Sequence, residues 1–541
     1  MITTVGEAAA PTTTASASLV QSVDWLAIAP PTITAAVALA LLVADLFVPE
    51  AHKRWLGAGA VAGLAAALLT LIPLRDGDRS TFCLTADTDT CSYAADPFAL
   101  SIQLLVLGGA LLTALISLHS AHREHPVGEY WFLLLASAAG AALLPAARDL
   151  ATLVVALEVA SLPAFALVGL RRGDRLSSEA ALKFFLSSVT ATAVTLLGAS
   201  FVYAASGSLH LTRIAAELDN APDQLDTLVT TGVVLTLIGF AFKTAAVPFH
   251  FWVPDTYVGA PLPVAAFLSV VGKAVGFSGL ILVTVVAFPD HAEVWGPVVA
   301  VLAALTMTLG NAAAVRQDPD LPRSAVRLLA WSSVGQAGYI LVPIAAAAYS
   351  DDVEIGAAVA YALMYAVVNL GAFAVVALVA RSSPLNRISD YRGLYARSPL
   401  AALALAFFLL CLAGLPPGII GLFAKVTVFS TAVDAGLGWL AVVMAANVVI
   451  ALYYYLKWTA VLFRAPEENA APVASGAVAA SGGTATGSGG TTTVAADPVT
   501  GSAGAVAAPA LTLAIGLTTV VAVALSGYPE LVLRLAATGL F

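Results

Sequence analysis

The chain has 541 residues, of which 60% are hydrophobic and 11% are charged, and its mean hydropathy is +0.92. This composition lies far outside the range of soluble globular proteins and excludes a chain built of soluble catalytic domains. The formal net charge of −9 does not describe one surface, because a membrane protein divides its charges between two sides.

The N-terminal stretch from Met1 to Asp24 contains neither lysine nor arginine. It therefore lacks the charged start of a secretory signal peptide, and we predict an N-terminal tail over residues 1–25. Apolar stretches of about 18–25 residues then recur, and each is long enough to cross a hydrocarbon core as a helix. These predicted spans are 26–48, 57–74, 98–118, 130–147, 151–170, 180–206, 228–251, 262–288, 295–315, 327–349, 355–380, 399–431, 437–463 and 509–527. The sequence thus predicts an all-α polytopic membrane protein with about 14 transmembrane helices.

The basic residues are concentrated in alternate connections between the spans. If the N-terminus lies outside, the connections expected on the cytoplasmic side carry Lys53, Arg54, Arg123, Arg171, Arg172, Arg175, Arg316, Arg323, Arg327, Arg381, Arg387, Arg392, Arg397 and Arg464. The opposite connections carry Arg75, Arg79, Arg148, Arg213 and Arg534. Because cytoplasmic loops are enriched in Lys and Arg, we expect a multi-pass protein of the cell inner (plasma) membrane with both termini on the outer side.

Two further features lie outside the spans. Residues 465–508 are rich in Ala, Gly, Ser and Thr, which predicts a flexible linker before a last helix and C-terminus at 509–541. Cys83 and Cys91 share a connection expected on the outer side, where thiols can oxidise. A disulfide and two free thiols are both compatible with the sequence.

Ionisable side chains recur within the apolar spans. An ionised side chain at the bilayer centre costs at least ~2.5–3.5 kcal/mol on insertion scales, so each one requires a partner, water or a function. Lysine can lose its proton when it is desolvated, whereas arginine stays protonated, so lysines suit a proton relay. The residues concerned are Glu158 and the lysines Lys183, Lys243, Lys273, Lys425 and Lys457. For Lys183 and Lys457, reaching an interface or pairing locally is an alternative explanation.

Two spans combine a lysine with helix-breaking prolines. FAFKTAAVPFHFWVPD contains Lys243 with Pro248 and Pro254, and LAGLPPGIIGLFAKVTVF contains Lys425 after a Pro-Pro pair. Proline removes a helical hydrogen bond, so we predict interrupted helices at both places. Paired discontinuous helices in two halves of a chain indicate an inverted repeat with a functional site near mid-membrane.

Four segments carry a resemblance to a known family: GFAFKTAAVPFHFWVPDTYVGAPLPVAAF, TLGNAAAVRQ, RLLAWSSVGQAGYILV and YRGLYARSPLAALALAFFLLCLAGLPP. From about Pro97 to Arg464 the chain resembles the subunit N family of proton-pumping NADH:quinone oxidoreductase, respiratory complex I. The resemblance implies helices 1–3 over 26–118 and two inverted five-helix antiporter-like repeats, at 130–288 (helices 4–8) and 295–463 (helices 9–13). Helices 7 and 12 would be the broken ones.

The resemblance also implies a proton relay. Matching positions are the fifth-helix glutamate Glu158, the sixth-helix Lys183, the broken seventh-helix Lys243, the eighth-helix Lys273 and the second broken-helix Lys425. His250 and Lys457 are candidate polar links. The chain departs from the family pattern at Gln336, where many relatives have histidine, at Leu262, which replaces a threonine, and at Lys425, which follows its Pro-Pro pair one residue late. Gln336 therefore puts a relay through the tenth helix in doubt.

The function implied by the resemblance is that of a proton-translocating membrane subunit of NADH:quinone oxidoreductase, a translocase that couples electron transfer from NADH to quinone to proton pumping. The chain has no paired CxxC set and no GxGxxG fingerprint, so no redox centre is expected in it. FMN, iron–sulfur clusters, NADH and quinone would belong to the complex. Expected partners are other complex I subunits, especially neighbouring antiporter-like and small membrane subunits, and the lipid bilayer, with no nucleic acid. The alternatives are a subunit of a multisubunit cation/proton antiporter and a membrane scaffold with an inactive channel.

Overall fold

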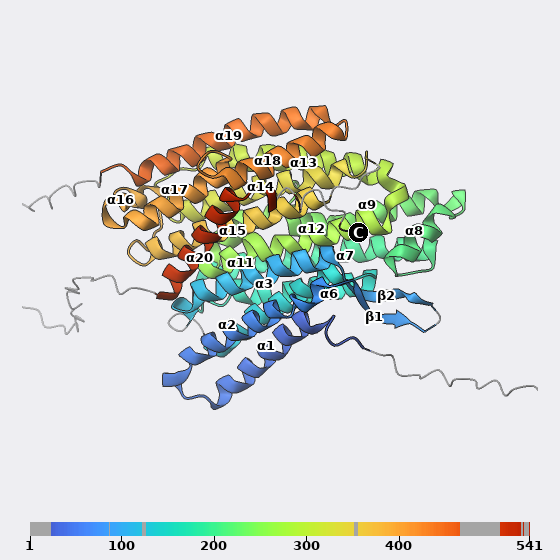
Figure 1. Cartoon of the computed structure of the whole chain (residues 1–541), viewed down its shortest axis with the longest axis horizontal. Helices are drawn as coiled ribbons and strands as arrows, with labels where there is room; N and C mark the ends of the chain where they lie inside the picture. Colours follow the sequence, from blue (N-terminus) through green and yellow to red (C-terminus); the bar gives the residue numbers. More distant parts are fainter. Residues whose placement is uncertain are drawn as a thin grey trace, which may run out of the picture.

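A computed structural model of the chain describes residues 23–85, 87–121, 126–350, 355–465, 509–531, 534 and 540. Nearly all of the predicted tail and of the predicted linker lies outside the described residues. In the described part, thirteen helices are long and apolar enough to cross a membrane, and Pro399–Ala413 is a shorter apolar helix. The helices run side by side along the horizontal direction of Figure 1.

The helix bounds agree with the predicted spans along most of the chain. The helices before residue 250 are α1 (Ala29–Phe47), α2 (Arg54–Leu69), α3 (Pro97–Ser117), α5 (Val127–Leu143), α6 (Leu150–Val168), α7 (Arg175–Ser206), α8 (Leu211–Asp219) and α9 (Asp226–Thr244). Those after it are α10 (Trp252–Gly259), α11 (Leu262–Phe267), α12 (Lys273–Ile281), α13 (Ala292–Val315), α14 (Ser324–Ala346), α15 (Gly356–Ala380), α16 (Leu394–Arg397), α17 (Pro399–Ala413), α18 (Ile419–Asp434), α19 (Gly438–Leu462) and α20 (Pro509–Gly527).

Three predicted spans are irregular in the structure. The predicted span 399–431 is divided between α17 and α18, because the chain leaves the helix at Gly414, which has a φ of +83°. The predicted span 228–251 ends early, at Thr244, and an irregular segment leads to α10. The third, 262–288, is one helical run in which π-helical turns precede and follow α12.

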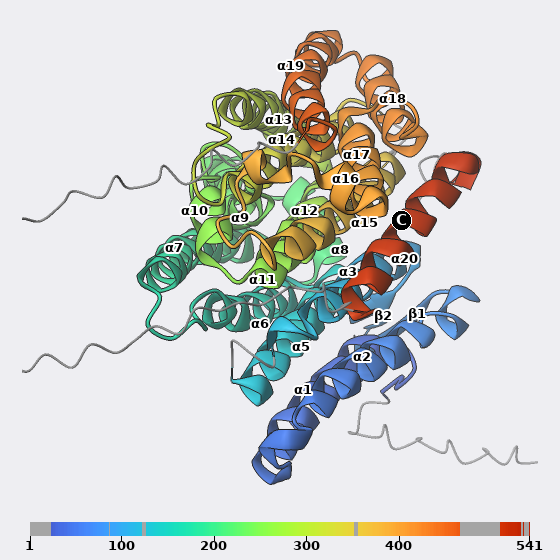
Figure 2. The same cartoon turned by 90° about the vertical axis from the view of Figure 1, so that its left-hand side faces the viewer.

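The two ends of the bundle differ. At one end, shown on the right of Figure 1, lie α8 and a two-stranded antiparallel hairpin of β1 (Arg79–Leu84) and β2 (Asp87–Ala95). We call this the hairpin end. At the other end, α16 lies among arginine-rich connections that contact one another, as where the Arg323 amide bonds Leu385 and the Gly393 amide bonds Arg464. We call this the arginine end, and it faces the viewer in Figure 2.

The sequence analysis did not predict this hairpin. Three ion pairs join residues in or next to the hairpin to distant residues: Arg79 with Asp24 at 3.0 Å, Asp87 with Arg213 at 2.8 Å, and Asp96, which directly follows β2, with Arg148. The pairs attach the hairpin to the helices around it. Burial also raises the pKa of Tyr93 in β2 to about 12, and its hydroxyl accepts a hydrogen bond from Gln103.

Cys83 and Cys91 lie opposite each other in the hairpin and are joined as a disulfide. We therefore expect that, before reduction, digests of the membrane protein contain one linked peptide pair and that neither cysteine is alkylated. Mass spectrometry of digests prepared with and without reductant measures this. Cys411, buried as a free thiol in α17, is the internal control, because it must be alkylated in denatured protein under both conditions. Alkylation of all three cysteines without reductant would contradict the pairing.

The centre of the bundle is formed by α14, α15 and the helical run Leu262–Ala287, whose residues are mostly buried. Small residues let these helices approach closely, as is usual where lipid provides no hydrophobic driving force between helices. A Cβ atom added at Gly310 in α13 would lie 2.4 Å from the backbone nitrogen of Gly335 in α14. Two of the polar residues described next, Lys273 and Gln336, lie on these enclosed helices.

Candidate functional site

Lys243 lies at the end of α9, one residue before the last residue of the helix. Its side chain is 5% exposed, and its ammonium lies 5.2 Å from the ring centroid of Phe165 and 5.0 Å from that of Phe184. Ala245, two residues further along the chain, adopts a left-handed conformation and ends the helix. A cavity of about 10 Å³, bordered also by Ser161, adjoins the lysine. This is room for about one water beside a buried cation.

Glu158 projects from α6 and is half-buried. It accepts a hydrogen bond of 2.7 Å from the Thr192 hydroxyl of α7 and interacts electrostatically with Lys243. The structure therefore brings together this predicted carboxylate and this predicted lysine. The negative charge of Glu158 favours a protonated Lys243.

Lys183 has different partners. Its ammonium donates to Asp255 at 2.9 Å and pairs with Glu179 at 2.8 Å, and its side chain is 49% exposed. Within the described residues, no hydrogen bond or ion pair joins Lys183 to Glu158. The lysine thus lies on the outer face of α7 in a cluster with two carboxylates, one of which comes from α10.

Lys273 is the first residue of α12 and is 1% exposed. Its ammonium donates a hydrogen bond to the backbone carbonyl of Ser333 in α14. The preceding π-helical turn, Leu268–Gly272, contains Ser269, whose hydroxyl accepts a hydrogen bond of 2.7 Å from Asn369. Such turns are frequent at functional sites. Lys273 is therefore held in the centre of the bundle by its hydrogen bond to α14.

Lys425 lies in α18, where its ammonium donates to the carbonyls of Leu412 and Ala413 at 2.8 and 2.9 Å. These carbonyls end α17 and have no helical partner, because the helix stops at Gly414. The ammonium also lies 5.4 Å from the ring centroid of Tyr339. The interruption between α17 and α18 therefore supplies the acceptors that hold a buried cation.

Gln336 lies between Lys273 and Lys425 and connects four segments. Its side-chain amide donates to the Tyr455 hydroxyl at 3.1 Å and to the Leu412 carbonyl at 3.2 Å, and its oxygen accepts from the Tyr361 hydroxyl. The Tyr455 hydroxyl also bonds the Ser332 hydroxyl at 2.6 Å. Since Ser332 adjoins Ser333, a nearly continuous row of polar groups joins Lys273 to Lys425.

A branch leaves this row towards the outer face of the bundle. Tyr454 donates to Asn311 at 3.0 Å, and Asn311 donates to Asn447 at 3.1 Å. Asn447 in turn donates to the exposed hydroxyl of Thr308 at 3.1 Å. The tyrosines, serines and asparagines of the row and its branch were not identified from the sequence. A polar residue at regular spacing in an apolar span is the only signal that could have indicated them.

The two candidate polar links differ in position. His250 lies in the irregular segment between α9 and α10, with its ring centroid 5.7 Å from that of Trp331, and interacts electrostatically with Lys273. Lys457 lies on the exposed face of α19, and its ammonium is 5.8 Å from the ring centroid of Tyr453. The structure therefore does not bring Lys457 together with the buried lysines.

The chain is similar to known proteins along most of its length. Residues 147–451 match the family described as NADH:quinone oxidoreductase/Mrp antiporter, TM. The NADH-quinone oxidoreductase subunit N 2 of Streptomyces griseus subsp. griseus is 72% identical over 524 residues, which are 97% of this chain and 95% of that protein. A chain of respiratory complex I from Thermus thermophilus matches with a TM-score of 0.71 and 31% identity, covering 94% of this chain and 100% of that one. A chain of the Mrp complex from a Dietzia species shares the fold, with a TM-score of 0.72 at 23% identity and coverage of 94% and 96%.

Proposed function

This chain belongs to the NADH:quinone oxidoreductase/Mrp antiporter family of membrane subunits, and we propose that it is a proton-translocating membrane subunit of NADH:quinone oxidoreductase. The observation that carries the proposal is the set of three buried lysines, Lys243, Lys273 and Lys425, each in an apolar helix and each at or near an interruption of regular helix. Buried ionisable residues of this kind mark proton pathways in membrane proteins.

The proposed path begins at Lys243. Protons from the cytoplasm reach this lysine, pass by way of Lys273, and leave towards the outer side near Lys425. Hydroxyl groups and water can both donate and accept, so the Ser332 and Tyr455 hydroxyls suit a relay between the second and third lysines. An amide does not readily exchange its protons at neutral pH, so Gln336 acts by holding the hydroxyls in position.

Charges beside the path would regulate it. Glu158 favours the charged form of Lys243, so a change in their separation changes how readily the lysine releases its proton. The ion pair of Lys183 with Asp255, on the outer face of α7, would act on the charge of the path in the same way. A neighbouring subunit that alters these charges would couple distant chemistry to proton release, as a coupling free energy between two sites. His250 remains a candidate link near the entrance.

The partners are proposed to be neighbouring antiporter-like and small membrane subunits. Lys183 lies eight residues from the first residue of α7, Arg175, which is about 12 Å into the bundle at 1.5 Å per residue. A half-exposed cluster of three charges at this depth is costly against lipid and is better covered by protein. The driving redox energy, with NADH, FMN, the iron–sulfur clusters and quinone, belongs to other subunits of the complex.

We also infer the repeat boundaries and the orientation. The interruptions after Thr244 and after Ala413 fall at corresponding places of the two segments 130–288 and 295–463, which supports two repeats. The arginine end is assigned to the cytoplasm and both termini to the outer side of the plasma membrane, following the positive-inside rule.

Membrane vesicles test the function against the antiporter alternative. In vesicles from cells that lack the chain, we expect NADH-driven proton pumping to be lost and to return with the restored gene. Sodium–proton exchange driven by an imposed pH gradient should be the same in both, because the lysine path depends on redox chemistry elsewhere in the complex. Loss of exchange with intact NADH-driven pumping would instead favour the antiporter, and loss of neither would favour the scaffold.

A further inference from the structure

The short helix α10 lies between Lys183, on the outer face of α7, and the buried Lys243. Its Asp255 accepts a hydrogen bond from Lys183. Its first residue, Trp252, stacks on Phe184 of α7 with the ring centroids 4.4 Å apart, and the ammonium of Lys243 lies 5.0 Å from the centroid of the same Phe184 ring. Since α10 has eight residues, which is about two turns, Asp255 and Trp252 move together. A shift of α10 therefore acts on the surroundings of both lysines.

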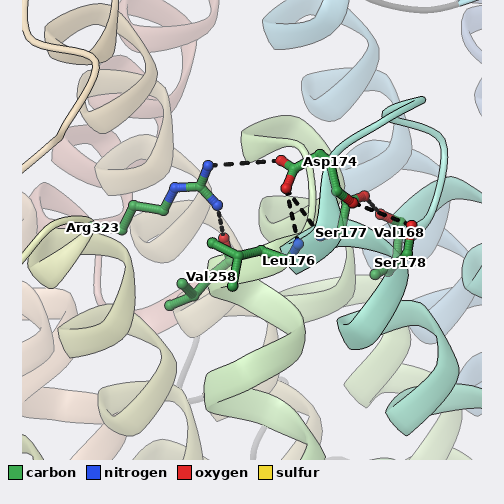
Figure 3. A network of polar contacts seen from close by, with 7 residues as sticks. All are labelled: Val168, Asp174, Leu176, Ser177, Ser178, Val258 and Arg323. Atoms are coloured by element: carbon green, nitrogen blue, oxygen red, sulfur yellow. Dashed lines mark hydrogen bonds and ion pairs between the residues drawn. The ribbon is translucent and has the colours of Figure 1, made fainter.

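The end of α10 is held by an arginine from the segment 295–463. Arg323, the N-cap of α14, donates a hydrogen bond to the carbonyl of Val258 in the last turn of α10 (Figure 3). The last carbonyls of a helix have no partner within the helix, so a basic side chain there satisfies one of them. Arg323 is itself fixed, because its amide donates to the Leu385 carbonyl at 2.6 Å. The position of α10 therefore depends on α14.

The same guanidinium group also reaches the start of α7. It lies 4.0 Å from the carboxylate of Asp174, the N-cap of that helix (Figure 3). The Asp174 side chain accepts hydrogen bonds from the amides of Leu176 and Ser177 at 2.9 and 3.4 Å, so the carboxylate is attached to α7. Arg323 thus bridges the end of α10 and the start of α7.

Between these points α10 and α7 are in direct contact. A Cβ atom added at Gly259 would lie 2.4 Å from the Cβ atom of Ala180 and 2.8 Å from the Leu176 carbonyl oxygen. The two helices are as close as their backbones permit at this place. A displacement of α10 can therefore only increase the separation of Asp255 from Lys183.

Lys183 has one partner on its own helix and one on α10. It pairs with Glu179 of α7 at 2.8 Å and with Asp255 at 2.9 Å. The Glu179 pair lies within one helix and does not depend on the position of α10, whereas the Asp255 pair does. If α10 moves away from α7, the charge of Lys183 is balanced by one carboxylate in place of two.

We propose that Arg323 is a positioning residue that keeps Asp255 in contact with Lys183, by holding the end of α10 against the start of α7. This inference rests on the proposed function, in which the charges beside the path regulate it. Since α14 also carries Ser333, whose carbonyl holds Lys273, a movement of α14 reaches the outer ion pair through Arg323. The two halves of the path are thereby coupled in the sense of two sites that share a free energy.

Zero-length cross-linking tests the proposal on the intact complex. A carbodiimide condenses an amine and a carboxylate that are in contact to an amide, and the water that is lost converts the carbodiimide to a urea. Lys183 can thus be linked to Asp255 or to Glu179, and mass spectrometry of digests measures the ratio of the two products. The Glu179 product is the internal standard, because Glu179 lies four residues from Lys183 on the same helix.

In the variant Arg323→Gln we expect the ratio of the Asp255 product to the Glu179 product to fall at least about threefold, because a charge-assisted hydrogen bond is lost. Arg327→Gln is the matched control, since Arg327 lies on the same helix and its side chain has no hydrogen bond or ion pair within the described residues. Equal ratios in the two variants would overturn the proposal. If Arg323→Gln does not assemble, Arg323→Lys gives the same comparison, because lysine lacks the fork that reaches two partners.

Proton pumping separates positioning from general structural damage. We expect Arg323→Gln to lower NADH-driven pumping at least about threefold in the otherwise unchanged protein, but less than about twofold when it is added to Lys183→Ala, where no ion pair is left to position. An equal fall in both backgrounds would overturn the proposal. If Lys183→Ala alone pumps normally, the charges beside the path do not regulate it and the proposed function is wrong on this point, whereas the cross-link ratio still decides what Arg323 holds.

Discussion

Replacement of Lys243 by alanine is expected to lower NADH-driven proton pumping at least about tenfold, because a positioned proton-transfer group typically contributes a factor of 10²–10⁴. The residue is buried beside a cavity with room for about one water, and its charge interacts with that of Glu158. Inside-out membrane vesicles with a pH-sensitive dye measure the pumping. Quinone reduction by NADH should fall together with it, because the two processes are coupled.

Two further variants serve as controls for this experiment. Lys243→Arg keeps the positive charge but cannot release the proton, so a relay function requires that it fails as Lys243→Ala does. Lys457→Ala removes an exposed lysine of α19 and should leave pumping unchanged. NADH oxidation by an artificial acceptor must survive in all three variants, which shows that the complex has assembled. Normal pumping in Lys243→Arg would mean that only the charge of Lys243 matters.

Replacement of Gln336 by leucine is expected to have the second large effect. It removes the hydrogen bonds to Tyr455 and to the Leu412 carbonyl, and it leaves the buried Tyr361 hydroxyl without its acceptor. A buried polar group without a partner costs about 1–3 kcal/mol. We therefore expect both a lower thermal stability of the complex and a fall of several-fold in pumping, measured by unfolding in detergent and by the vesicle assay.

Gln336→His is the informative companion. Histidine can donate one hydrogen bond and accept another, so it can preserve the row between Tyr361 and Tyr455, and it adds a group that titrates between pH 5 and 8. Pumping by this variant should remain near that of the unchanged protein. If Gln336→Leu pumps normally as well, the row of hydroxyls past Gln336 carries no protons, and the path between Lys273 and Lys425 must run elsewhere.

The membrane helices were predictable because hydropathy depends only on local sequence, and the helices of the described part follow the predicted spans closely. The lysines were predictable for a related reason. A charge in an apolar span is costly wherever the helix lies, so its presence alone indicates a partner or a function. The interruption after Ala413 could be expected from the Pro-Pro pair, but the division into two separate helices could not.

What could not be predicted depends on how the helices face one another. Uncharged polar side chains cost less than a charge in a membrane helix, so serine, tyrosine and glutamine do not stand out in the sequence. Ser332, Tyr455 and Gln336 form a row only once α14 and α19 are packed together. The partners of Lys183 are Asp255 and the local Glu179, and not Glu158, because the rotation of α7 turns this lysine outwards. The hairpin was missed for the same reason, since its ion pairs join residues that are far apart in the sequence.

Two of the three buried lysines donate to backbone carbonyls, Lys273 to that of Ser333 and Lys425 to those of Leu412 and Ala413. A carbonyl accepts a hydrogen bond but cannot take over the proton, so none of these three acceptors can receive the proton that the ammonium group carries. To pass a proton on, the tip of the lysine has to swing to a hydroxyl or a water. Rotation of the Lys273 and Lys425 side chains therefore gates proton transfer. In the arrangement seen here, both ammonium groups are held by backbone carbonyls and neither passes its proton on.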